Sequence, residues 1–380
     1  MPDSNQIRYG LIGCGMMGQE HLRNIALLSG VEVAAIFEPD AQMRKASQHL
    51  APQARMLTRI EEVFEVSGLD ALVITSPNHC HAAQLETIFA QRSVPVLVEK
   101  PVCVSTAEAR ALESLAKRTN APIWVGMEYR YMPPIAAMID KVHGQPASAA
   151  PIMLTVREHR YPFLSKVGDW NRFSANTGGT LVEKCCHFFD LMRLIMKANP
   201  IRLFASGSMN HNHKDEAYDG RVPDMLDNAY VVLDFPDRRR AMLELCMFAE
   251  ASEYQEEISA VSPLGKITCR VPGPSRFWPE QQMGPQPTAE LVVEHRDPRR
   301  REQSAIPVDP VLLKAGDHNG STFYQHEKFL AVVRGESAVE VSLMDGINAA
   351  LIGMAAEYSC STGKPVDLAE GPYRLLVGEI

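Results

Sequence analysis

The stretch Gly13-Cys14-Gly15-Met16-Met17-Gly18 decides the fold, because its glycines repeat as GxGxxG. It follows an apolar run, Ile7–Ile12, that predicts a β-strand, and it leads into residues 16–28, where apolar residues recur at helical spacing. A glycine turn between a strand and a helix lets the backbone approach a pyrophosphate, which the helix N-terminus then faces. The hexapeptide alone is a weak signal, and its place in the first strand–turn–helix unit makes it specific.

An acidic residue follows the turn at the distance expected for a dinucleotide site. Glu38 directly follows the second predicted strand, Val31–Phe37. A carboxylate there accepts hydrogen bonds from a ribose diol and repels a 2′-phosphate, so the sequence predicts NAD rather than NADP. Arg44 and Lys45 lie shortly afterwards and temper this preference. The alternative is a tight glycine turn that holds no ligand.

Strands and helices alternate through the first ~125 residues. Further strands are predicted at 70–75, 95–98 and 122–127, and helices at 40–50, 79–91 and 105–118. Almost continuously apolar strands separated by helices are typical of a doubly wound parallel sheet that is buried on both faces. We therefore predict an α/β fold with an NAD-binding Rossmann domain over residues 1–127.

The pattern changes after residue 128. A helix over 132–142, a strand over 152–157 and one long amphipathic helix over 179–197 are predicted. Four strands then follow without helices between them, at 202–209, 228–235, 240–248 and 256–261. Successive strands favour antiparallel pairing, so residues 128–380 are predicted to form an α+β substrate-binding and oligomerisation domain with a largely antiparallel open sheet. A proline-rich loop at 271–288 and two helices, 321–335 and 343–361, complete it.

Length and composition narrow the class of protein. A chain of 380 residues suggests two domains. With 38 Lys and Arg against 46 Asp and Glu, the net charge of −8 argues against a nucleic-acid or anionic-membrane surface. No apolar run approaches the ~20 residues of a membrane span, and the first residues lack a secretory pattern. Eight scattered cysteines without a CxxC pair are typical of reduced thiols, so we expect a cytoplasmic protein.

Four segments together resemble the glucose–fructose oxidoreductase/inositol dehydrogenase (Gfo/Idh/MocA) family. They are the glycine turn, Thr75–His81 (TSPNHCH, like the family's TPxxxH), Glu99-Lys100-Pro101 (the family's EKP) and Gly178–Asp190 (like GGGxLxDxxxHxxD). The EKP motif is the most specific of these. The resemblance covers essentially the whole chain. It implies a Rossmann domain followed by an α/β domain with an open sheet, and often oligomers, dimers or tetramers, built through that sheet.

Lys100 is the first candidate catalytic residue. It follows the strand at 95–98 and therefore lies at the carboxyl edge of the parallel sheet, where doubly wound folds bind ligands. A lysine beside a nicotinamide can hold a substrate oxygen and stabilise negative charge there. Glu99 would orient this lysine or touch the cofactor. The alternative is an exposed lysine after a strand.

Glu183 and His187 are the other candidate catalytic residues. They are four residues apart, so they share one face of the predicted helix, and His187 can exchange the hydroxyl proton. The family usually has Asp at the position of Glu183, which leaves the role of this longer carboxylate open. A buried histidine without a catalytic role is the alternative. A metal is not expected, because the nearby His211, Asn212 and His213 have the pattern of a polar turn.

The resemblance also implies cofactor and substrate contacts. The implied cofactor-binding residues are Gly13, Gly15, Met16, Met17, Gly18, Glu38, Thr75, Pro77, Asn78, His81, Glu99, Lys100 and Arg172. Thr75, Pro77, Asn78 and His81 would line the adenine–ribose side, although His81 could equally be a solvated polar residue. The implied substrate-binding residues are Tyr129, Arg157, Asn171, Arg172 and His318.

These observations favour an NAD-dependent oxidoreductase that acts on a secondary hydroxyl of a small sugar, cyclitol or derivative. A redox glycosidase that retains NAD is the alternative, and a non-catalytic sugar-sensing regulator is a third possibility, disfavoured by the presence of both Lys100 and His187. Basic residues at 157, 159, 160, 166 and 172 also suggest an anionic group on the substrate. A solvated charged edge explains the same cluster, because residues 157 and 159 on a strand face away from residue 160.

Overall fold

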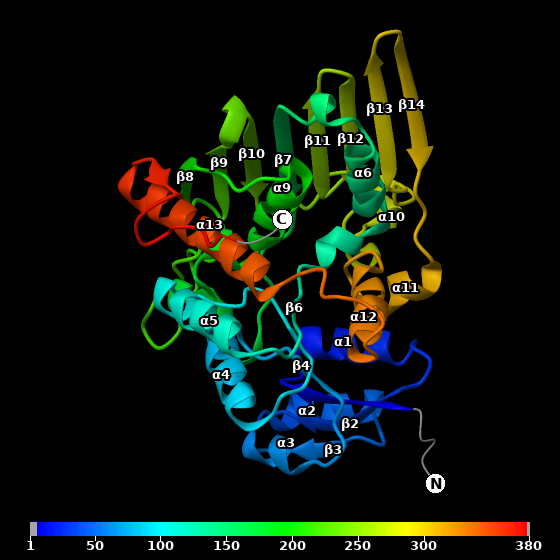
Figure 1. Ribbon diagram of the computed structural model, residues 1–380, viewed down its shortest axis with the longest axis vertical. Coiled ribbons are helices and arrows are strands. Elements are labelled where there is room, and N and C mark those ends of the chain that lie inside the picture. The colour runs from blue at the N-terminus through cyan, green and yellow to red at the C-terminus, as the bar shows by residue number, and fades with distance from the viewer. Residues whose placement is uncertain (1–5, 378–380) are drawn as a thin grey trace.

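The structure is a computed structural model that describes residues 6–377. Two sheets and their helices form the two halves of the molecule (Figure 1). The blue and cyan N-terminal half lies below the green and yellow second sheet in this view. Within residues 6–377, no helix is long and apolar enough to cross a membrane.

The first half contains a six-stranded parallel sheet in the order β3-β2-β1-β4-β5-β6. Its strands are β1 (Ile7–Ile12), β2 (Val31–Phe37), β3 (Arg55–Leu57), β4 (Ala71–Ile74), β5 (Val96–Val98) and β6 (Ile123–Val125). Every residue of β4 and β5 is buried, as expected for strands covered on both faces. The predicted doubly wound sheet is therefore confirmed, with β3 as a short edge strand that the sequence analysis missed.

Helices cover this sheet. They are α1 (Met16–Ile25), α2 (Ala41–Leu50), α3 (Glu61–Glu65), α4 (His81–Gln91) and α5 (Thr106–Arg118). The Asp40 side chain accepts the Met43 amide at the start of α2, and Ser105 accepts the Glu108 amide at the start of α5. The order of strands reverses between β1 and β4, which places the glycine turn at the switch point of the sheet.

The second half contains a nine-stranded sheet in the order β14-β13-β12-β11-β7-β10-β9-β8-β15. Its strands are β7 (Met153–His159), β8 (Arg202–Ser208), β9 (Asn228–Asp234), β10 (Arg240–Cys246), β11 (Glu256–Ser262), β12 (Gly265–Val271), β13 (Glu290–Arg296), β14 (Arg299–Ala305) and β15 (Val366–Asp367). Only β7 and β10 pair in parallel, so the prediction of a largely antiparallel sheet is confirmed. The sequence analysis missed β12 to β15. Every residue of β14 is exposed, and it therefore has no apolar alternation to detect.

Helices of the second half join the two sheets. They are α6 (Pro133–His143), α7 (Ser174–Thr177), α8 (Thr180–Glu183), α9 (Cys186–Met196), α10 (Glu280–Met283), α11 (Pro310–Ala315), α12 (Ser321–Val333) and α13 (Leu343–Thr362), with the 3₁₀ turns η2 (Glu128–Tyr131) and η4 (Val167–Arg172). The red and orange α13 packs against β8 and α9 on one side and against α5 and β6 on the other (Figure 1). Helix α12 packs against α1 and η2, so the C-terminal helices return to the Rossmann half.

The helix predicted over 179–197 is wrong in one respect, because it is broken into α8 and α9. Lys184 and Cys185 form a turn between the two helices. The Glu183 carbonyl oxygen accepts a hydrogen bond from Lys100 Nζ at 2.9 Å, where a continuous helix would use the amide of His187. The break therefore lets Lys100, which follows β5, bind the end of α8, one turn before His187 on α9.

Candidate active site

The glycine turn is held tightly on one side and open on the other. Gly13 has φ +82°, and a Cβ there would lie 2.6 Å from the Ser76 backbone. Thr75 Oγ1 donates a hydrogen bond to the Gly13 carbonyl at 2.5 Å. A Cβ at Gly15 would meet no atom within 4 Å, and Gly15 caps α1 without a side-chain hydrogen bond. The turn thus leaves open space and free amides for a pyrophosphate, with Met16, Met17 and Gly18 starting the helix.

Glu38 lies beside this turn in the position expected for a ribose ligand. Its Oε2 accepts the Cys14 amide at 2.6 Å, and its Oε1 accepts the Asp40 amide at 2.8 Å. Each carboxylate oxygen keeps a second lone pair for a diol. Arg44 donates to the backbone carbonyls of Glu38 and Pro39, so its Nη1 is already engaged. The residues of the turn and Glu38 fit NAD.

Lys100 and Glu99 extend from the carboxyl end of β5 into separate networks. Glu99 is buried and contacts His21 Nε2 at 3.0 Å, whereas Lys100 Nζ donates to the Glu183 carbonyl. Burial alone would lower the pKa of Lys100, but the nearby carboxylates, Glu183 first, raise it overall. Lys100 is therefore an ammonium group, and two of its three N–H donors remain for a ligand.

Glu183 contacts residues from three separate segments of the chain, namely Asn78, Lys100 and Lys166. Its Oε1 lies 3.1 Å from Lys166 Nζ, and its Oε2 accepts a hydrogen bond from Asn78 Nδ2. Burial favours the neutral acid, but Lys166 and Lys100 together lower the pKa of Glu183, which keeps the carboxylate charged. Lys166 also lies 4.6 Å from the centre of the Trp170 ring. The sequence analysis missed Lys166 as a partner of Glu183, because the loop that carries it has no periodic pattern.

His187 is buried against Tyr129. The two rings stack at 4.1 Å between centroids and 9° between planes. Among residues 6–377, His187 Nδ1 has no hydrogen-bond partner, although the side chain is only 2% exposed. Burial lowers the pKa of His187 well below its usual value, and the charges of Lys100 and Lys184 add to this effect. His187 is therefore a neutral imidazole, able to accept a proton.

Two further polar groups lie behind and beside the Tyr129 ring. Lys184 Nζ donates to the Tyr129 hydroxyl at 2.5 Å and lies 3.0 Å from the buried carboxylate of Glu158. The His318 ring lies 6.1 Å from the Tyr129 ring. Tyr129 and His318 are thus gathered with His187, as the family resemblance implied, although their binding of a substrate stays a prediction.

Several residues expected at the cofactor already have partners within the protein, and their contact with NAD stays a prediction. Asn78 Nδ2 donates to Glu183 Oε2, so its side chain lies beside a candidate catalytic residue. His81 is fully buried, with its ring nitrogens 2.8 Å from Pro101 O and 2.9 Å from Ser76 O, so the solvated alternative is wrong. His81 therefore links the turn at Ser76 to the turn at Pro101. Pro77 precedes the 3₁₀ turn of Asn78–Cys80 and has no polar side-chain group to offer.

The expected basic cluster is dispersed. Arg172 is buried, and it donates to Glu216 at 2.8 Å, to the Phe163 carbonyl at 3.1 Å and to Ser165 Oγ at 3.2 Å. A buried guanidinium must satisfy its donors, and here they hold the preceding loop. Asn171 also binds that loop, through the Leu164 carbonyl. Arg157 forms an ion pair with Glu257. This pair lies on one face of β7, and Glu158 lies on the other. The structure therefore does not bring Arg157, Asn171 and Arg172 to Lys100 and His187 as free ligands.

An open glycine turn at the switch point of a parallel sheet and a carboxylate after β2 define the NAD-binding Rossmann class. The chain belongs to the Gfo/Idh/MocA oxidoreductase family. The family's NAD-binding Rossmann-fold model matches residues 7–127, and its C-terminal α/β-domain model matches residues 150–368.

Named relatives are similar over part of their length. The rhizopine catabolism protein MocA of Rhizobium meliloti is 29% identical over 51% of this chain and 59% of its own. An inositol 2-dehydrogenase of Corynebacterium glutamicum (strain R) is 33% identical over 34% of this chain and 39% of its own. The chain thus spans between about two fifths and three fifths of these curated relatives in the matched regions.

Solved structures share the whole fold at low identity. A myo-inositol dehydrogenase from Corynebacterium glutamicum ATCC 13032 has a TM-score of 0.73 at 20% identity, covering 96% of this chain and 100% of that chain. GenD2 from gentamicin A biosynthesis, in complex with NAD, has a TM-score of 0.74 at 18% identity, covering 96% of each chain. At this identity the likeness shows the fold.

Proposed function

We propose that this protein is an NAD-dependent oxidoreductase that acts on a secondary hydroxyl of a sugar, cyclitol or related polyol. The observation that carries the proposal is the meeting of Lys100, Glu183 and a neutral His187 at the carboxyl edge of the parallel sheet. Relatives named for rhizopine catabolism and as inositol 2-dehydrogenases support this substrate class.

The residues suit alcohol oxidation in a simple way. NAD, when bound at the glycine turn, supplies the hydride acceptor. Lys100 holds the reacting oxygen with its remaining N–H donors and stabilises negative charge that develops there. His187, neutral and buried, accepts the hydroxyl proton. Glu183 positions Lys100 through its backbone carbonyl, while its carboxylate is held by Lys166 and Asn78.

An anionic substrate has less support than a neutral polyol. Arg157, Lys166 and Arg172 each pair with a glutamate, and His159 lies 3.2 Å from Glu244. Of the five basic residues of the sequence cluster, Arg160 has the longest ion pair, with Nη1 3.7 Å from Glu158, and its Nε donates to the Tyr161 carbonyl at 3.2 Å. We therefore favour a neutral sugar or cyclitol, while a single anionic group near Arg160 is the variant to test.

The second candidate function is a redox glycosidase that retains NAD. Such an enzyme needs a group that donates a proton to the departing oxygen, in addition to a base. The observation that favours it is His318, a second histidine near Tyr129 whose pKa lies on the opposite side of neutrality from that of His187.

A substrate panel separates these functions. The protein would be incubated with NAD and myo-inositol, glucose, glucuronate and the p-nitrophenyl glycosides of the two sugars. We expect NADH from at least one free polyol, and loss of that signal in Lys100→Met. Release of p-nitrophenol without net NADH would establish the glycosidase instead. If neither product forms from any compound, the proposed substrate class is wrong.

A further inference from the structure

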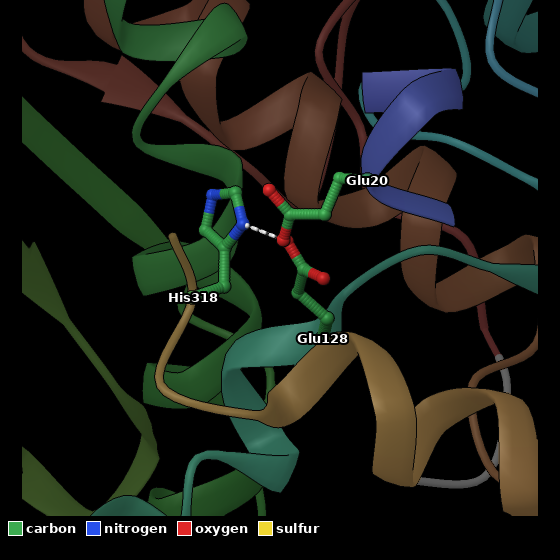
Figure 2. A group of neighbouring side chains, drawn as sticks. All are labelled: Glu20, Glu128 and His318. Atoms are coloured by element: carbon green, nitrogen blue, oxygen red, sulfur yellow. Dashed lines mark hydrogen bonds and ion pairs between the residues drawn. The ribbon is translucent and has the colours of Figure 1, made fainter. Parts of the chain in front are cut away.

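His318 is held by two glutamates that come from different parts of the chain (Figure 2). Its Nδ1 lies 2.7 Å from Glu20 Oε1, on the second turn of α1, and 3.5 Å from Glu128 Oε1, in η2. Figure 2 shows both carboxylates on the same side of the imidazole ring. His318 itself lies in the loop before α12. Three distant segments therefore meet at one ring nitrogen.

The two carboxylates are fixed before any ligand arrives. Glu20 and Glu128 are 4% and 0% exposed, and Thr322 Oγ1 lies 2.9 Å from Glu20 Oε1 and 2.6 Å from Glu128 Oε2. Two buried carboxylates at this spacing repel each other unless a positive charge lies between them. The imidazole of His318 is placed to carry that charge, with its Nδ1–H directed at Glu20.

The other nitrogen of His318 is the one that faces outward. No residue within the described range 6–377 makes a hydrogen bond to His318 Nε2, and the side chain is 22% exposed. The ring lies 6.1 Å from the Tyr129 ring, which in turn stacks on His187. A protonated imidazole has two N–H donors, and only Nδ1–H is committed here. The Nε2–H donor is thus available, on a ring that lies beside Tyr129.

We propose that His318 donates a hydrogen bond from Nε2–H to an oxygen of the substrate, and that Glu20 and Glu128 are positioning residues that keep this imidazole charged and oriented. This inference rests on the proposed function and deepens it. The site would contain two histidines in opposite states, His187 as proton acceptor and His318 as fixed donor. A substrate would need an oxygen acceptor beside the reacting carbinol, which sugars and cyclitols have.

The charges around His318 agree with this assignment. Burial would lower the pKa of His318, but Glu128 and Glu20 raise it to about 9, against a smaller opposing effect of Lys184. Burial would raise the pKa of Glu20, but His318 lowers it to about 2. Burial raises the pKa of Glu128, and the like charges of Glu99 and Glu20 add to this, although His318 opposes it.

A metal ion is a poorer occupant of this cluster than a proton. Glu20, Glu128 and His318 offer three ligand atoms close together. Two ligands on one tetrahedral zinc, at about 2.0–2.1 Å each, would lie roughly 3.3 Å apart. The 2.7 Å separation between His318 Nδ1 and Glu20 Oε1 is instead that of a charge-assisted hydrogen bond.

The first test needs no substrate. Histidine ring nitrogens would be labelled with ¹⁵N, and His318 assigned by comparing wild type with His318→Gln. We expect His318 to be doubly protonated at neutral pH and to titrate near pH 9, and Glu128→Gln to move this titration to lower pH. The matched control is Glu244→Gln beside His159, a partly exposed His–Glu pair on the far face of the sheet, which should leave His318 unchanged. A neutral His318 at neutral pH would overturn the inference.

The second test measures the donor role with whichever panel polyol yields NADH. His318→Gln should lower kcat/KM by about 10–100-fold with unchanged NAD affinity, and His159→Gln should not. Because the donor is a protonated His318, wild-type activity should fall as the pH rises through about 9. Glu128→Gln should move this fall to lower pH, without the full loss of activity expected for His318→Gln. Normal activity in His318→Gln would overturn the inference and leave the oxidoreductase standing. If no polyol yields NADH, the proposed function fails and this inference with it.

Discussion

At the scale of single residues, Lys100 shows how one side chain sets both structure and chemistry. Its Nζ donates to the Glu183 carbonyl at the break between α8 and α9, and its remaining N–H donors are the ones that we propose hold the reacting oxygen. The charge on Glu183 helps to keep this partly buried lysine an ammonium group. The same contact therefore orients the candidate acid–base group.

Replacing Lys100 or His187 tests this arrangement. We expect Lys100→Met and His187→Ala each to lower kcat/KM by at least about 100-fold, because positioned acid–base groups contribute at that level. NAD affinity, measured by calorimetry, should change much less. Lys117→Met on the exposed face of α5 is the control and should keep full activity. Near-normal turnover in either variant would remove that residue from the mechanism.

The His318–Glu20 pair predicts a pH dependence of stability. The pKa of His318 rises from 6.5 to about 9 in the fold, so its contribution is complete below pH 6.5 and disappears as the pH rises through 9. The pKa of Glu20 falls from 4.5 to about 2, so its contribution is complete above pH 4.5 and disappears as the pH falls through 2. The pair should stabilise the fold most between pH 4.5 and 6.5.

Thermal unfolding of wild type and His318→Gln at several pH values checks this expectation. The difference in unfolding free energy between them should shrink by up to about 3 kcal/mol as the pH rises from 6.5 past 9. Parallel curves for the two proteins would show that His318 carries no raised pKa.

At the scale of elements, the start of α8 depends on two glycines and on a glutamate from α13. Gly178 and Gly179 have φ of +82° and +97°. A Cβ at Gly179 would overlap the Glu357 carboxyl group, which accepts the Leu181 amide at 2.8 Å. Helix α13 thereby caps the short helix that ends in Glu183.

We expect Gly179→Ala to destabilise the protein by about 2–3 kcal/mol, from the strained backbone and the displaced cap. Gly363, at the end of α13, provides the control, because its φ is +66° and a Cβ there meets open space. Gly363→Ala should cost only about 1–2 kcal/mol and leave activity intact. Denaturant unfolding measures both variants. If Gly179→Ala and Gly363→Ala lose the same unfolding free energy, Glu357 does not constrain the turn at Gly179.

At the scale of the whole molecule, two sheets and the returning C-terminal helices set the relation between cofactor and substrate residues. Helix α12 packs on α1, which follows the glycine turn, and α13 packs on both halves. Cofactor binding at the turn should therefore stabilise the folded chain as a whole.

We expect NAD to bind at least about 10-fold more tightly than NADP, because Glu38 repels a 2′-phosphate. Calorimetry measures both affinities, and the rise in unfolding temperature should follow the same order. Glu38→Gln removes the negative charge and should make the affinities for NAD and NADP more similar. Equal or reversed affinities in wild type would overturn the assignment of Glu38.

The open face of the second sheet predicts self-association. Apolar side chains that point away from the core are exposed on four of its strands, namely Met153, Phe204, Tyr230, Val232 and Val261. Exposed apolar side chains gathered on one face are typical of an interface. Light scattering should give a multiple of the 42.1 kDa chain mass, and Phe204→Asp with Val232→Asp should lower it. The control is Val311→Asp on α11, and a wild-type monomer would contradict this expectation.

Sequence patterns determined the fold class and much of the cofactor site. The parallel strands are almost continuously apolar, and the glycine turn with Glu38 lies within one local unit, so these features depend on short stretches of chain. Lys100 could be placed at the sheet edge for the same reason. The exposed β14 and the break after Glu183 could not be predicted, because neither leaves a local periodic signal.

Only the tertiary structure decided which charges meet. Glu20, Glu128 and His318 are far apart in sequence and come together because α12 packs on α1 and η2. Lys166 forms an ion pair with Glu183. Arg172 belongs to the same basic cluster in the sequence, but it donates to a carbonyl of the loop that precedes it. The physical reason is that a buried charge takes its state from neighbours within a few ångströms, and those neighbours are set by packing between distant segments rather than by the order of residues.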